Sequence, residues 1–549
     1  MTPALLIDSA DNLAVALRQL EENETVSIGG HEVKLSEPIP PKQKFTLHDF
    51  AVGERATLYG VTVGVATEFI ARGGLIHTGN LKHDADGFTG EQTKVADWTA
   101  PDVSQWSART FDGYYRADGS VGTANQWLVI PMVFCENRNV NAIRAAFERA
   151  LGYEKTTHYQ KLAAELAARH RAGASPEELA ALTCEELESM PGDRLFPNVD
   201  GIKFLTHSMG CGGTRDDAAA LCGLLAGYIT HPNVAGATVL SLGCENAQLD
   251  LLTDAIQARS PQFDKPLLTF RQQSYPDEKT LLETAIKQTF AGLVQANRAE
   301  RQPAPLDKLC IGVECGGSDG FSGISANPTL GVLSDQLVAL GGRVILSEFP
   351  ELCGVEQELV NRCVTPEVAD RFVQLTRAYA ERARAVGSDF SQNPSPGNIR
   401  DGLITDAIKS AGAAKKGGSS PVVAALDYPE IATDPGLSLL CTPGGDVEST
   451  TAMAGAHANV ILFTTGLGTP TGNPVCPVVK ISTNTELAER LSDLIDFDTG
   501  AIIRGEASLE QLSDALLDLI VEVASGRVQT KAQILGQDDF QPWKRGVSL

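Results

Sequence analysis

The segment Leu309-Cys-Ile-Gly-Val-Glu-Cys-Gly-Gly-Ser-Asp-Gly320 shows a pattern that repeats through most of this 549-residue chain. Its first part, 309–313, is a short apolar run typical of a buried strand, and a carboxylate, a thiol and glycines follow directly. Beyond residue 112, similar runs alternate with longer helical segments, which is typical of a largely parallel sheet. The sequence therefore predicts an α/β fold for this large region, built as one or two subdomains.

Thiol and carboxylate side chains also follow four other predicted strands. Those strands cover 127–131, 202–206, 238–242 and 344–347, and further strands are predicted over 266–270, 460–464 and 478–481. The segments that follow the four are Phe134-Cys-Glu-Asn137, His207-Ser-Met-Gly-Cys-Gly-Gly213, Gly243-Cys-Glu-Asn246 and Glu348-Phe-Pro-Glu-Leu-Cys353. Because the carboxyl ends of parallel strands line the ligand crevice of an open sheet, we expect all five sets to meet in one cleft.

Such a cleft has the chemistry of a metal site. Thiolates, imidazole and carboxylates together suit a divalent transition metal such as iron or zinc, and the glycines allow backbone N–H groups to face a carboxylate substrate. The alternative is that each cysteine is a small buried apolar residue and each Gly-Gly pair an ordinary turn. Both interpretations stay open. The chain has no Cys-x-x-Cys, Walker A or His-Glu-x-x-His sequence, and no Gly-x-Gly-x-x-Gly opening a helix after a strand.

Charge and composition exclude several classes of protein. With 45 basic and 69 acidic side chains, the chain has a net charge of −24, so its surface repels nucleic acids and anionic lipids. An anionic small substrate would need a local cationic or metal-containing pocket. The N-terminus does not resemble a signal peptide, and no run approaches the roughly 18 apolar residues that span a bilayer. We expect a cytoplasmic protein without nucleic-acid or membrane partners, and a homo-oligomer.

The first ninety residues predict a small β-rich domain. Short β-like runs at 26–28, 32–35, 44–47, 56–65 and 75–78 are separated by Pro and Gly. Before them, Leu13, Ala16, Leu17 and Leu20 share one helical face, which predicts a helix.

The remaining boundaries follow from composition. We interpret the polar stretch 91–112 as a linker, 113–392 as an α/β catalytic domain, and 393–549 as a C-terminal α/β portion that completes it. Capping boxes predict helix starts at Ser175 and Ser508, and Gly526 can end the second of these helices.

Several other side chains are candidates for catalysis or binding. His207 lies in a glycine-rich loop and His77 at the end of a predicted strand, although a single loop histidine is more often a satisfied polar residue. Lys409 and its neighbours at 415–416 lie in a Gly/Ala-rich stretch and are suited to hold a substrate carboxylate, the alternative being ordinary solvated lysines. The polar segment 442–451 is a further candidate binding loop.

These loops resemble the altronate/galactarate dehydratase family, in order along nearly the whole chain. The matching motifs are Gly113-Tyr-Tyr-Arg-Ala-Asp-Gly-Ser-Val-Gly-Thr-Ala-Asn125, the 207–213 loop, Leu242-Gly-Cys-Glu-Asn246, Glu314-Cys-Gly-Gly-Ser-Asp-Gly-Phe-Ser-Gly-Ile-Ser-Ala-Asn-Pro328, Asn393-Pro-Ser-Pro-Gly-Asn398, Lys415-Lys-Gly-Gly418 and Phe463-Thr-Thr-Gly-Leu-Gly-Thr-Pro-Thr-Gly-Asn-Pro474. The first ninety residues resemble the family's SAF (β-clip) domain.

The resemblance implies a hydro-lyase assisted by ferrous iron, with Mn²⁺ or Zn²⁺ as alternatives. In the altronate branch, D-altronate would give 2-dehydro-3-deoxy-D-gluconate and water. A bound cation would neutralise the substrate carboxylate while a base removes the C2 proton and an acid protonates the C3 hydroxyl. Galactarate dehydration, sulfite loss from sulfolactate, and sugar-acid binding without catalysis remain as alternatives.

The motifs and the resemblance together give the candidate site residues. The candidate catalytic residues are His207, Lys409, His77 and Asp319. The candidate metal ligands are Cys211, Cys244, Glu245 and Cys315. The candidate substrate-binding residues are Asn125, Gly212, Gly213, Asn246, Gly316, Gly317, Ser318, Asn398, Lys416, Asp446 and Glu448.

The chain departs from the family pattern at four of its positions. Gln43 and Gly79 stand where the family usually has histidines, Ala124 where it has arginine, and Ile408 where it has glutamate. These departures remove side chains that would bind metal or substrate, so they weaken the transfer of substrate identity and, to a lesser degree, of metal identity.

Overall fold

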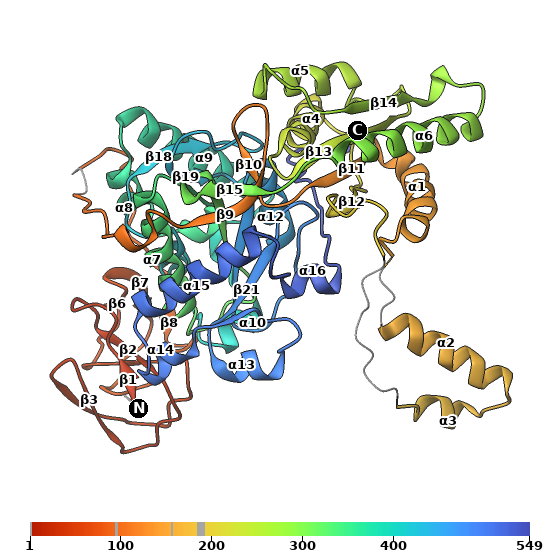
Figure 1. Cartoon of the computed structure of the whole chain (residues 1–549). Helices are drawn as coiled ribbons and strands as arrows, with labels where there is room; N and C mark the ends of the chain where they lie inside the picture. The colour runs from red at the N-terminus through yellow and green to blue at the C-terminus, as the bar shows by residue number, and fades with distance from the viewer. Residues whose placement is uncertain (1–2, 94–96, 155–157, 184–192) are drawn as a thin grey trace.

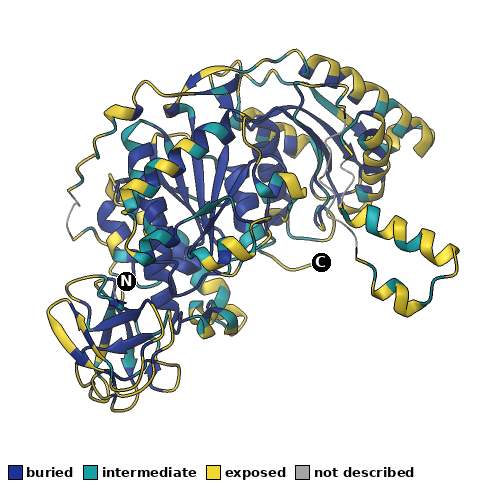
Figure 2. Cartoon of the chain, turned by 60° about the horizontal axis from the view of Figure 1, so that its bottom comes forward, coloured by how far each residue is buried: buried dark blue, intermediate teal, exposed yellow. Residues whose placement is uncertain are grey.

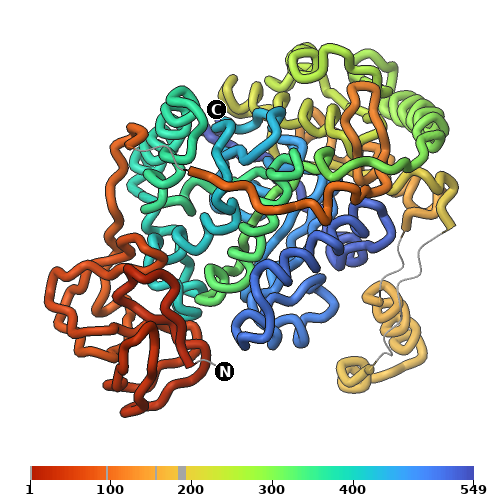
Figure 3. Tube along the Cα trace, turned by 60° about the vertical axis from the view of Figure 1, so that its left-hand side comes forward, coloured from red at the N-terminus to blue at the C-terminus, as the bar shows by residue number. Residues whose placement is uncertain are grey.

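The computed structural model describes residues 3–93, 97–154, 158–183 and 193–549. Figure 1 shows a small β-rich domain at the N-terminus, followed along the chain by an α/β unit, which we call the middle unit, and then by a larger, C-terminal α/β unit. In space, the C-terminal unit lies between the other two. The tube trace in Figure 3 shows the same arrangement, with the N-terminal domain docked against one end of the large unit. The expected fold class is confirmed: a β-rich N-terminal domain precedes a parallel α/β region.

The N-terminal domain consists of three small antiparallel sheets, with strand orders β1-β2-β5, β3-β4 and β6-β7-β8. Its strands are β1 (Ala4–Leu5), β2 (Leu13–Ala16), β3 (Thr25–Ile28), β4 (His31–Lys34), β5 (Lys44–Thr46), β6 (Arg55–Leu58), β7 (Val61–Ala66) and β8 (Leu81–Lys82).

The helix predicted from Leu13, Ala16, Leu17 and Leu20 is wrong. Residues 13–16 form strand β2, which pairs with β1 on one side and β5 on the other. All four residues of β2 are buried, so the strand shows no alternation of apolar and polar residues, and its apolar spacing resembles that of a helix.

The middle unit has a four-stranded parallel sheet in the order β12-β11-β13-β14. Its strands are β11 (Gln126–Pro131), β12 (Gly201–Phe204), β13 (Val234–Ser241) and β14 (Leu267–Arg271). Its helices are α1 (Asn137–Ala150), α4 (Arg215–Thr230), α5 (Leu249–Arg259) and α6 (Glu278–Ala296). Two more helices, α2 (His158–Arg171) and α3 (Pro176–Ala180), project from the body in Figure 1, and the capping box predicted at Ser175 opens α3.

The C-terminal unit has a seven-stranded parallel sheet in the order β18-β19-β17-β16-β20-β21-β22. Its strands are β16 (Cys310–Cys315), β17 (Arg343–Leu346), β18 (Val422–Leu426), β19 (Gly436–Leu440), β20 (Val460–Thr465), β21 (Val478–Ser482) and β22 (Phe497–Asp498). Figure 2 shows that these strands are almost entirely buried beneath helices whose outer faces are exposed.

Helices surround this sheet on both faces. They are α7 (Ala326–Ala339), α8 (Glu356–Arg362), α9 (Pro366–Ala385), α10 (Pro396–Arg400), α11 (Asp406–Ala413), α12 (Asp446–Gly455), α13 (Thr485–Arg490), α14 (Gly500–Arg504), α15 (Leu509–Ala524) and α16 (Lys531–Leu535). The capping box predicted at Ser508 opens α15, and Gly526, with a φ of 71°, follows its end as expected. Short 3₁₀ helices include η5 (Phe349–Leu352) and η7 (Ala414–Gly417).

The expectation that all five thiol-bearing strand ends share one cleft is wrong, because the strands belong to two sheets. β11, β12 and β13 lie in the four-stranded sheet, whereas β16 and β17 lie in the seven-stranded sheet. The sheets separate between α6 and β16, rather than at residue 392, where the sequence placed a boundary. The two units are joined by one apolar core in which Gly227 of α4 packs directly on the backbone of Gly455 of α12.

The segment between the N-terminal domain and the middle unit runs along the surface of the large unit. The backbone N–H of Thr89 donates to Gln357, and the side chain of Trp106 is buried and donates to Asp514 of α15. Strand β9 (Thr110–Tyr115) then pairs with β10 (Val121–Gly122) and β15 (Gln302–Pro305). Across the described ranges, every helix is too short or too polar to cross a membrane.

Candidate active site

A buried group of charged side chains lies at the carboxyl edge of the seven-stranded sheet. Its members come from the ends of β16 and β17, from η5, and from the elements α11, η7 and α12 that follow in the chain. We call it the charged cluster, and it consists of Glu314, Cys315, Glu348, Glu351, Lys409, Lys416 and Asp446. Four of these, Cys315, Lys409, Lys416 and Asp446, are candidates named from the sequence.

Lys416 lies at the centre of the charged cluster. Its Nζ is 2.7 Å from Glu348 Oε2 and 2.9 Å from Cys315 Sγ, and its side chain is 1% exposed. Burial opposes the charge on Lys416, but the neighbouring Cys315 and Glu348 outweigh this and raise the pKa of the ammonium well above its usual value. Lys416 therefore supplies a fixed positive charge inside the protein.

Lys409 supplies a second cation from helix α11. Its Nζ is 2.5 Å from Glu351 Oε1 and 2.6 Å from Asn393 Oδ1. Burial opposes this charge as well, but the carboxylate of Glu351 raises the pKa of Lys409 above its usual value. Both lysines are thus ammonium groups at neutral pH.

Glu314 and Glu348 each have one carboxylate oxygen without a hydrogen-bond partner in the described part of the chain. Glu314 Oε2 accepts hydrogen bonds from Ser449 at 2.6 Å and Ser347 at 3.3 Å. Glu348 Oε2 forms the ion pair with Lys416. The Oε1 atoms of both glutamates are buried and unpaired. Burial, followed by the charge of Glu348, raises the pKa of Glu314 well above its usual value. An unpaired buried carboxylate oxygen is costly, so a proton, a water molecule or a cation between these two groups would stabilise them.

Asp446 completes this carboxylate set at the start of α12. Its carboxylate and those of Glu314 and Glu348 place one oxygen each within 4.8 Å of one another. Cys315, Glu348 and Glu351 form a second set that meets the same spacing. Burial and the charge of Glu348 raise the pKa of Asp446 to about 7, so its protonation changes near neutral pH.

The loop before α12 and Asn393 are the half-buried residues beside the charged cluster. Gly444, Asp446 and Glu448 are half-buried, and a side chain at Gly444 would lie 2.7 Å from the amide nitrogen of Asn393. Glu448, a predicted binding residue, lies two residues after Asp446 on α12.

The glycine-rich loop after β16 lies against the charged cluster, as the sequence predicts for a binding loop. Gly316 packs on the carboxylate of Asp446 too closely for any side chain, and Gly317 has a φ of 59°. The backbone carbonyl of Ser318 accepts a hydrogen bond of 2.8 Å from Asn398, while the buried Ser318 Oγ is unpaired among the described residues. The loop thus holds Ser318 and Asn398 beside the cluster.

The N-terminal domain contacts the same edge of the sheet through β5 and the residues before it. Lys42 Nζ is 3.0 Å from Asp319 Oδ2, and Asp319 is fully buried and also accepts a hydrogen bond from Thr483. Lys44 is fully buried and donates to the carbonyl of Gly402 at 2.6 Å, and burial lowers its pKa to about 7. Asp319, a predicted catalytic residue, therefore holds two domains together in this structure.

The predicted metal ligands Cys211 and Cys244 belong to the other sheet. Both are exposed and lie on loops that follow β12 and β13, with Gly212, Gly213 and Asn246 alongside. The Asn246 amide donates to the carbonyls of Cys211 at 2.7 Å and Gly213 at 3.4 Å.

Glu245 is occupied within its own turn. Its carboxylate accepts hydrogen bonds from the Ser241 hydroxyl at 2.5 Å and from the Gly243 N–H at 2.6 Å. The structure therefore separates Cys315, in the charged cluster, from Cys211, Cys244 and Glu245.

His207 has both ring nitrogens engaged with the backbone. Its Nε2 is 2.7 Å from the Pro131 carbonyl, and its Nδ1 accepts from the Met209 N–H at 3.1 Å. Burial lowers its pKa to about 4, so the ring is neutral. In this geometry His207 fixes the loop that carries Cys211 and has no free nitrogen for proton transfer.

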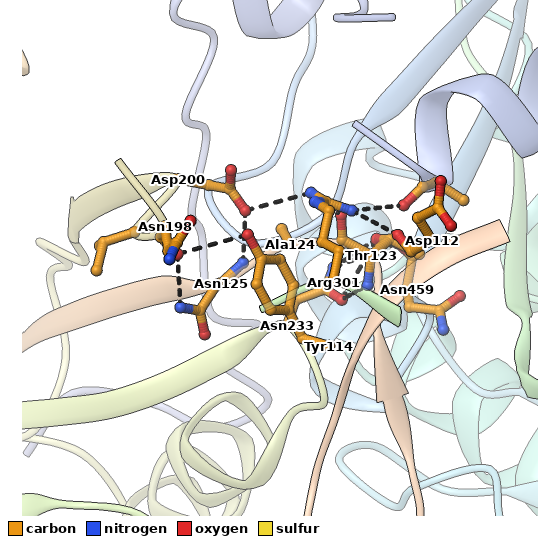
Figure 4. Close-up of polar contacts among 12 residues, drawn as sticks. Asp112, Tyr114, Thr123, Ala124, Asn125, Asn198, Asp200, Asn233, Arg301 and Asn459 are labelled. Carbon is orange, nitrogen blue, oxygen red and sulfur yellow. Dashed lines mark hydrogen bonds and ion pairs between the residues drawn. The ribbon is translucent and has the colours of Figure 1, made fainter. Parts of the chain in front are cut away.

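His77 and Asn125 lie away from both groups of residues. His77 is exposed on the N-terminal domain, where its Nδ1 accepts from the Gly79 N–H at 3.0 Å. Asn125 precedes β11, at the amino edge of its sheet, and its amide donates to the carbonyls of Asn198 and Ala296. Figure 4 shows Asn125 within a polar network in which Arg301 joins Asp200 to the carbonyl of Thr123.

The four departures from the family pattern occupy different surroundings. Ile408 is fully buried in the apolar core next to Lys409, and Ala124 is buried before β11. Gln43 donates to the carbonyl of Arg400 at 2.9 Å at the domain contact. Gly79 lies on the exposed turn with His77.

Sequence reasoning did not select Glu314, Glu348 or Glu351 as site residues, although their positions carried a signal. Glu314 lies at the end of strand β16 beside Cys315, Glu348 follows β17 by two residues, and Glu351 lies in η5 directly after it. Glu348 has a φ of 64°, a conformation that non-glycine residues rarely adopt and that often marks a functional site. Lys44 was missed because nothing in the sequence shows that the N-terminal domain covers the carboxyl edge of the large sheet.

Comparisons with known proteins agree with the domain order. Residues 2–84 match the altronate/galactarate dehydratase SAF domain, 113–297 the second domain of D-galactarate dehydratase/altronate hydrolase, and 306–548 the C-terminal domain of D-galactarate/altronate dehydratase. The chain is 33% identical to an altronate dehydratase of Escherichia coli K12 over 99% of both chains, and 32% identical to one of Bacillus subtilis 168 over the full length of both. It is 31% identical to the galactarate dehydratase (L-threo-forming) of E. coli K12, covering 91% of this chain and 88% of that one. The chain belongs to the D-galactarate/altronate dehydratase family of hydro-lyases.

Proposed function

We propose that the protein dehydrates a sugar acid in the charged cluster, and that its substrate is D-altronate, which gives 2-dehydro-3-deoxy-D-gluconate and water. The observation that carries this proposal is the convergence of two buried ammonium groups, Lys409 and Lys416, with carboxylates that have unpaired oxygens. Full-length similarity to two altronate dehydratases supports the choice of substrate.

The residues of the cluster meet the electrostatic needs of this reaction. Removing the C2 proton places negative charge on the adjacent carboxylate, and fixed ammonium groups in a water-poor site stabilise that charge without reorganising. Lys416, buried and fully charged, is suited to this role. Lys409 donates to the half-buried Asn393 and, as an ammonium, is suited to protonate the leaving C3 hydroxyl.

The carboxylates of Glu314, Glu348 and Asp446 fit a divalent cation. Three oxygen donors lie within 4.8 Å of one another, and two of the residues have an unpaired buried oxygen. Oxygen donors of this kind suit Mn²⁺ and Fe²⁺ better than a thiophilic ion, which makes Fe²⁺ or Mn²⁺ our choice over Zn²⁺. A cation held there would act as a Lewis acid on the substrate carboxylate.

A substrate panel tests the proposed function. The full-length protein, supplied with Fe²⁺ or Mn²⁺ under anaerobic conditions, is incubated separately with D-altronate, galactarate and sulfolactate, and keto acid and sulfite are measured. We expect keto-acid formation with a kcat/KM for D-altronate at least about tenfold above that for galactarate, and no sulfite. Faster turnover of galactarate, or release of sulfite from sulfolactate, would show that D-altronate is not the substrate.

Sugar-acid binding without catalysis is the competing function. It predicts that D-altronate binds the metal-loaded protein, as measured by calorimetry, and is recovered unchanged. The partly unpaired carboxylates beside the ammonium groups argue against it, because they repel the carboxylate of a ligand that such a site would only have to hold.

A further inference from the structure

Three cysteine-bearing loops meet at the carboxyl edge of the four-stranded sheet, away from the charged cluster. Cys135 follows β11, Cys211 follows β12 and Cys244 follows β13, and these three strands are adjacent in the order β12-β11-β13. Because parallel strands end at the same edge, the three thiols are brought to one side of the sheet.

Backbone hydrogen bonds tie the three loops to one another. The N–H of Phe134, next to Cys135, donates to the carbonyl of Met209 at 3.0 Å. The N–H of Asn246 donates to the carbonyl of Gly210 at 2.9 Å, and its side-chain amide donates to the carbonyl of Cys211. Gly210 has a φ of 101° and lies against the backbone of 132–133, so the loops approach as closely as only glycine allows.

The same three cysteines are distinguished by their exposure. Cys135, Cys211 and Cys244 are exposed, whereas the other cysteines in the described ranges are buried or half-buried. A free exposed thiol is a liability, because it oxidises and pairs with other chains, so three together indicate a use. Cys211 and Phe134, the neighbour of Cys135, border a cavity of about 290 Å³ that is also lined by 208–214, Lys544 and Leu549.

The three thiols do not have the spacing of a mononuclear centre in the described geometry. An ion bound at about 2.3 Å from each sulfur would hold the sulfurs within roughly 4.6 Å of one another. Among the described residues, the groups with ligand atoms within 4.8 Å of one another do not include these three sulfurs. A polynuclear centre accommodates a wider spacing of its cysteine ligands.

The carboxylates beside the thiols are already used by the protein. Glu245 is hydrogen-bonded within its turn, and the buried Glu136 accepts a hydrogen bond of 2.8 Å from Asn139. The protein therefore offers three thiolates and no obvious fourth ligand among the described residues.

We propose that Cys135, Cys211 and Cys244 bind an iron–sulfur cluster and leave one of its irons without a protein ligand. Each thiol would release its proton to water on binding iron, and inorganic sulfide, Fe²⁺ and Fe³⁺ would come from the solution in which the cluster is assembled, so that assembly needs no separate oxidant. Iron–sulfur clusters are ordinarily held by four cysteines, so a three-cysteine site leaves one iron open to water or to an oxygen ligand in the adjacent cavity. This centre is separate from the carboxylate set of the proposed function, and either can fail without the other.

The test is reconstitution of the full-length protein. Anaerobic protein is incubated with Fe²⁺, Fe³⁺, sulfide and a thiol reductant and then desalted. It is analysed for iron, acid-labile sulfide, visible absorption and the electron paramagnetic resonance of the reduced sample. We expect iron and sulfide in about equal amounts, with the absorption of thiolate-bound iron. Cys135→Ser, Cys211→Ser and Cys244→Ser should each lower bound sulfide by at least about tenfold.

Cys363→Ser is the matched control, because the buried Cys363 donates only to the carbonyl of Leu359 within its helix, and a serine hydroxyl can do the same. Circular dichroism confirms folding, which exposed substitutions should leave intact. Iron bound without sulfide, zinc bound at one ion per chain by the same cysteines, or undiminished sulfide in the three serine variants would each overturn the proposal. Turnover of D-altronate by cluster-free protein would leave the proposed function intact.

Discussion

Lys416 and Lys409 are surrounded by different partners, although both are buried cations. Lys416 contacts a carboxylate and a thiol, and Lys409 contacts a carboxylate and the amide oxygen of Asn393. Lys415, between them in sequence, is exposed. A substitution of Lys409 or Lys416 therefore removes a charge inside the cluster, whereas a substitution of Lys415 removes a charge on the surface.

We predict that Lys416→Met and Lys409→Met each lower kcat for sugar-acid dehydration by at least about 100-fold, because each loses a positive charge that stabilises the reacting carboxylate or protonates the leaving group. Removing one partner of a buried ion pair also costs about 3–5 kcal/mol in the free energy of unfolding. Steady-state kinetics are therefore measured below the melting temperature of each variant, with Lys415→Met as the control. Equal activity of Lys416→Met and Lys415→Met would exclude Lys416 from the reaction.

His207 should make the folded protein sensitive to acid. Its pKa is about 4 in the folded protein because it is buried, whereas it is about 6.5 in the unfolded chain. As the pH falls from about 6.5 towards 4, the unfolded chain binds a proton that the folded protein does not, so stability is lost in this window, by up to ~3 kcal/mol in total.

The measurement compares urea unfolding at pH 7.5 and pH 5 for the wild type and His207→Gln. The variant should be less stable at both pH values, but it should lose less stability between them by roughly 1–2 kcal/mol. His170→Gln, at an exposed histidine of α2, is the control and should follow the wild type. An identical pH dependence in His207→Gln would show that His207 is not held neutral in the folded protein.

The loop after β12 depends on Gly210 for its path. A Cβ atom at this position would lie 2.7 Å from the Val133 Cα and closer still to the Met132 carbonyl, and the φ of 101° disfavours any other residue. Gly173, in the turn between α2 and α3, has a φ of 93° and no atom within 4 Å of such a Cβ. Alanine substitutions at Gly173 and Gly210 therefore distinguish the cost of backbone strain alone from the cost of strain with steric overlap.

We predict that Gly173→Ala lowers the free energy of unfolding by about 1–3 kcal/mol, and that Gly210→Ala lowers it by more, because overlap with backbone atoms adds to the strain. Thermal unfolding of both variants measures the difference. Gly210→Ala should also displace Cys211 and reduce iron retention. If Gly210→Ala were more stable than Gly173→Ala, the loop around Gly210 would not approach the residues after β11 as closely as described.

Much of the parallel α/β region was predictable element by element. All eight strands predicted beyond residue 112 overlap observed strands, because short apolar runs bounded by polar loops are a local property of the sequence. Strands β18 and β19 were not predicted, although Val422–Leu426 is directly followed by Asp427 and Gly436–Leu440 by Cys441.

What the sequence did not reveal was which strands pair. Cys211, Cys244 and Cys315 follow strands of identical local pattern, yet hydrogen bonding assigns the first two to one sheet and the third to another. Pairing depends on contacts between residues hundreds of positions apart, which periodicity does not report. For the same reason, Glu348 and Glu351 were noted among the carboxylates after predicted strands, but they were not identified as the partners of Lys416 and Lys409.

The N-terminal domain and the C-terminal unit meet around the carboxyl edge of the seven-stranded sheet. One continuous apolar core includes Leu58 and Val63 of the N-terminal domain together with Ile311 of β16. Polar contacts between the domains include the Lys42–Asp319 ion pair and a hydrogen bond of 2.7 Å from Thr405 to the Val63 carbonyl. The N-terminal domain is therefore packed against the wall of the proposed active site rather than tethered at a distance.

We predict that Asp319→Asn loosens this contact and lowers the free energy of unfolding by about 3 kcal/mol, because it leaves Lys42 without its buried partner. Limited proteolysis in the segment between residues 84 and 112 should be faster than in the wild type. Asp401→Asn is the control, since Asp401 lies 3.4 Å from Lys42 but is partly exposed, and such pairs contribute about 1 kcal/mol or less. Equal proteolysis of the two variants would show that Asp319 does not hold the domains together.

One measurement tests most directly whether the reaction occurs in the charged cluster. It is the rate at which the wild type and Glu348→Gln, at matched metal supply, form 2-dehydro-3-deoxy-D-gluconate from D-altronate. Glu348 contacts Lys416 and belongs to both candidate ligand sets, so we predict turnover by the wild type and a loss of at least about 100-fold in the variant. Wild-type turnover by a folded Glu348→Gln protein would place the reaction elsewhere in the molecule.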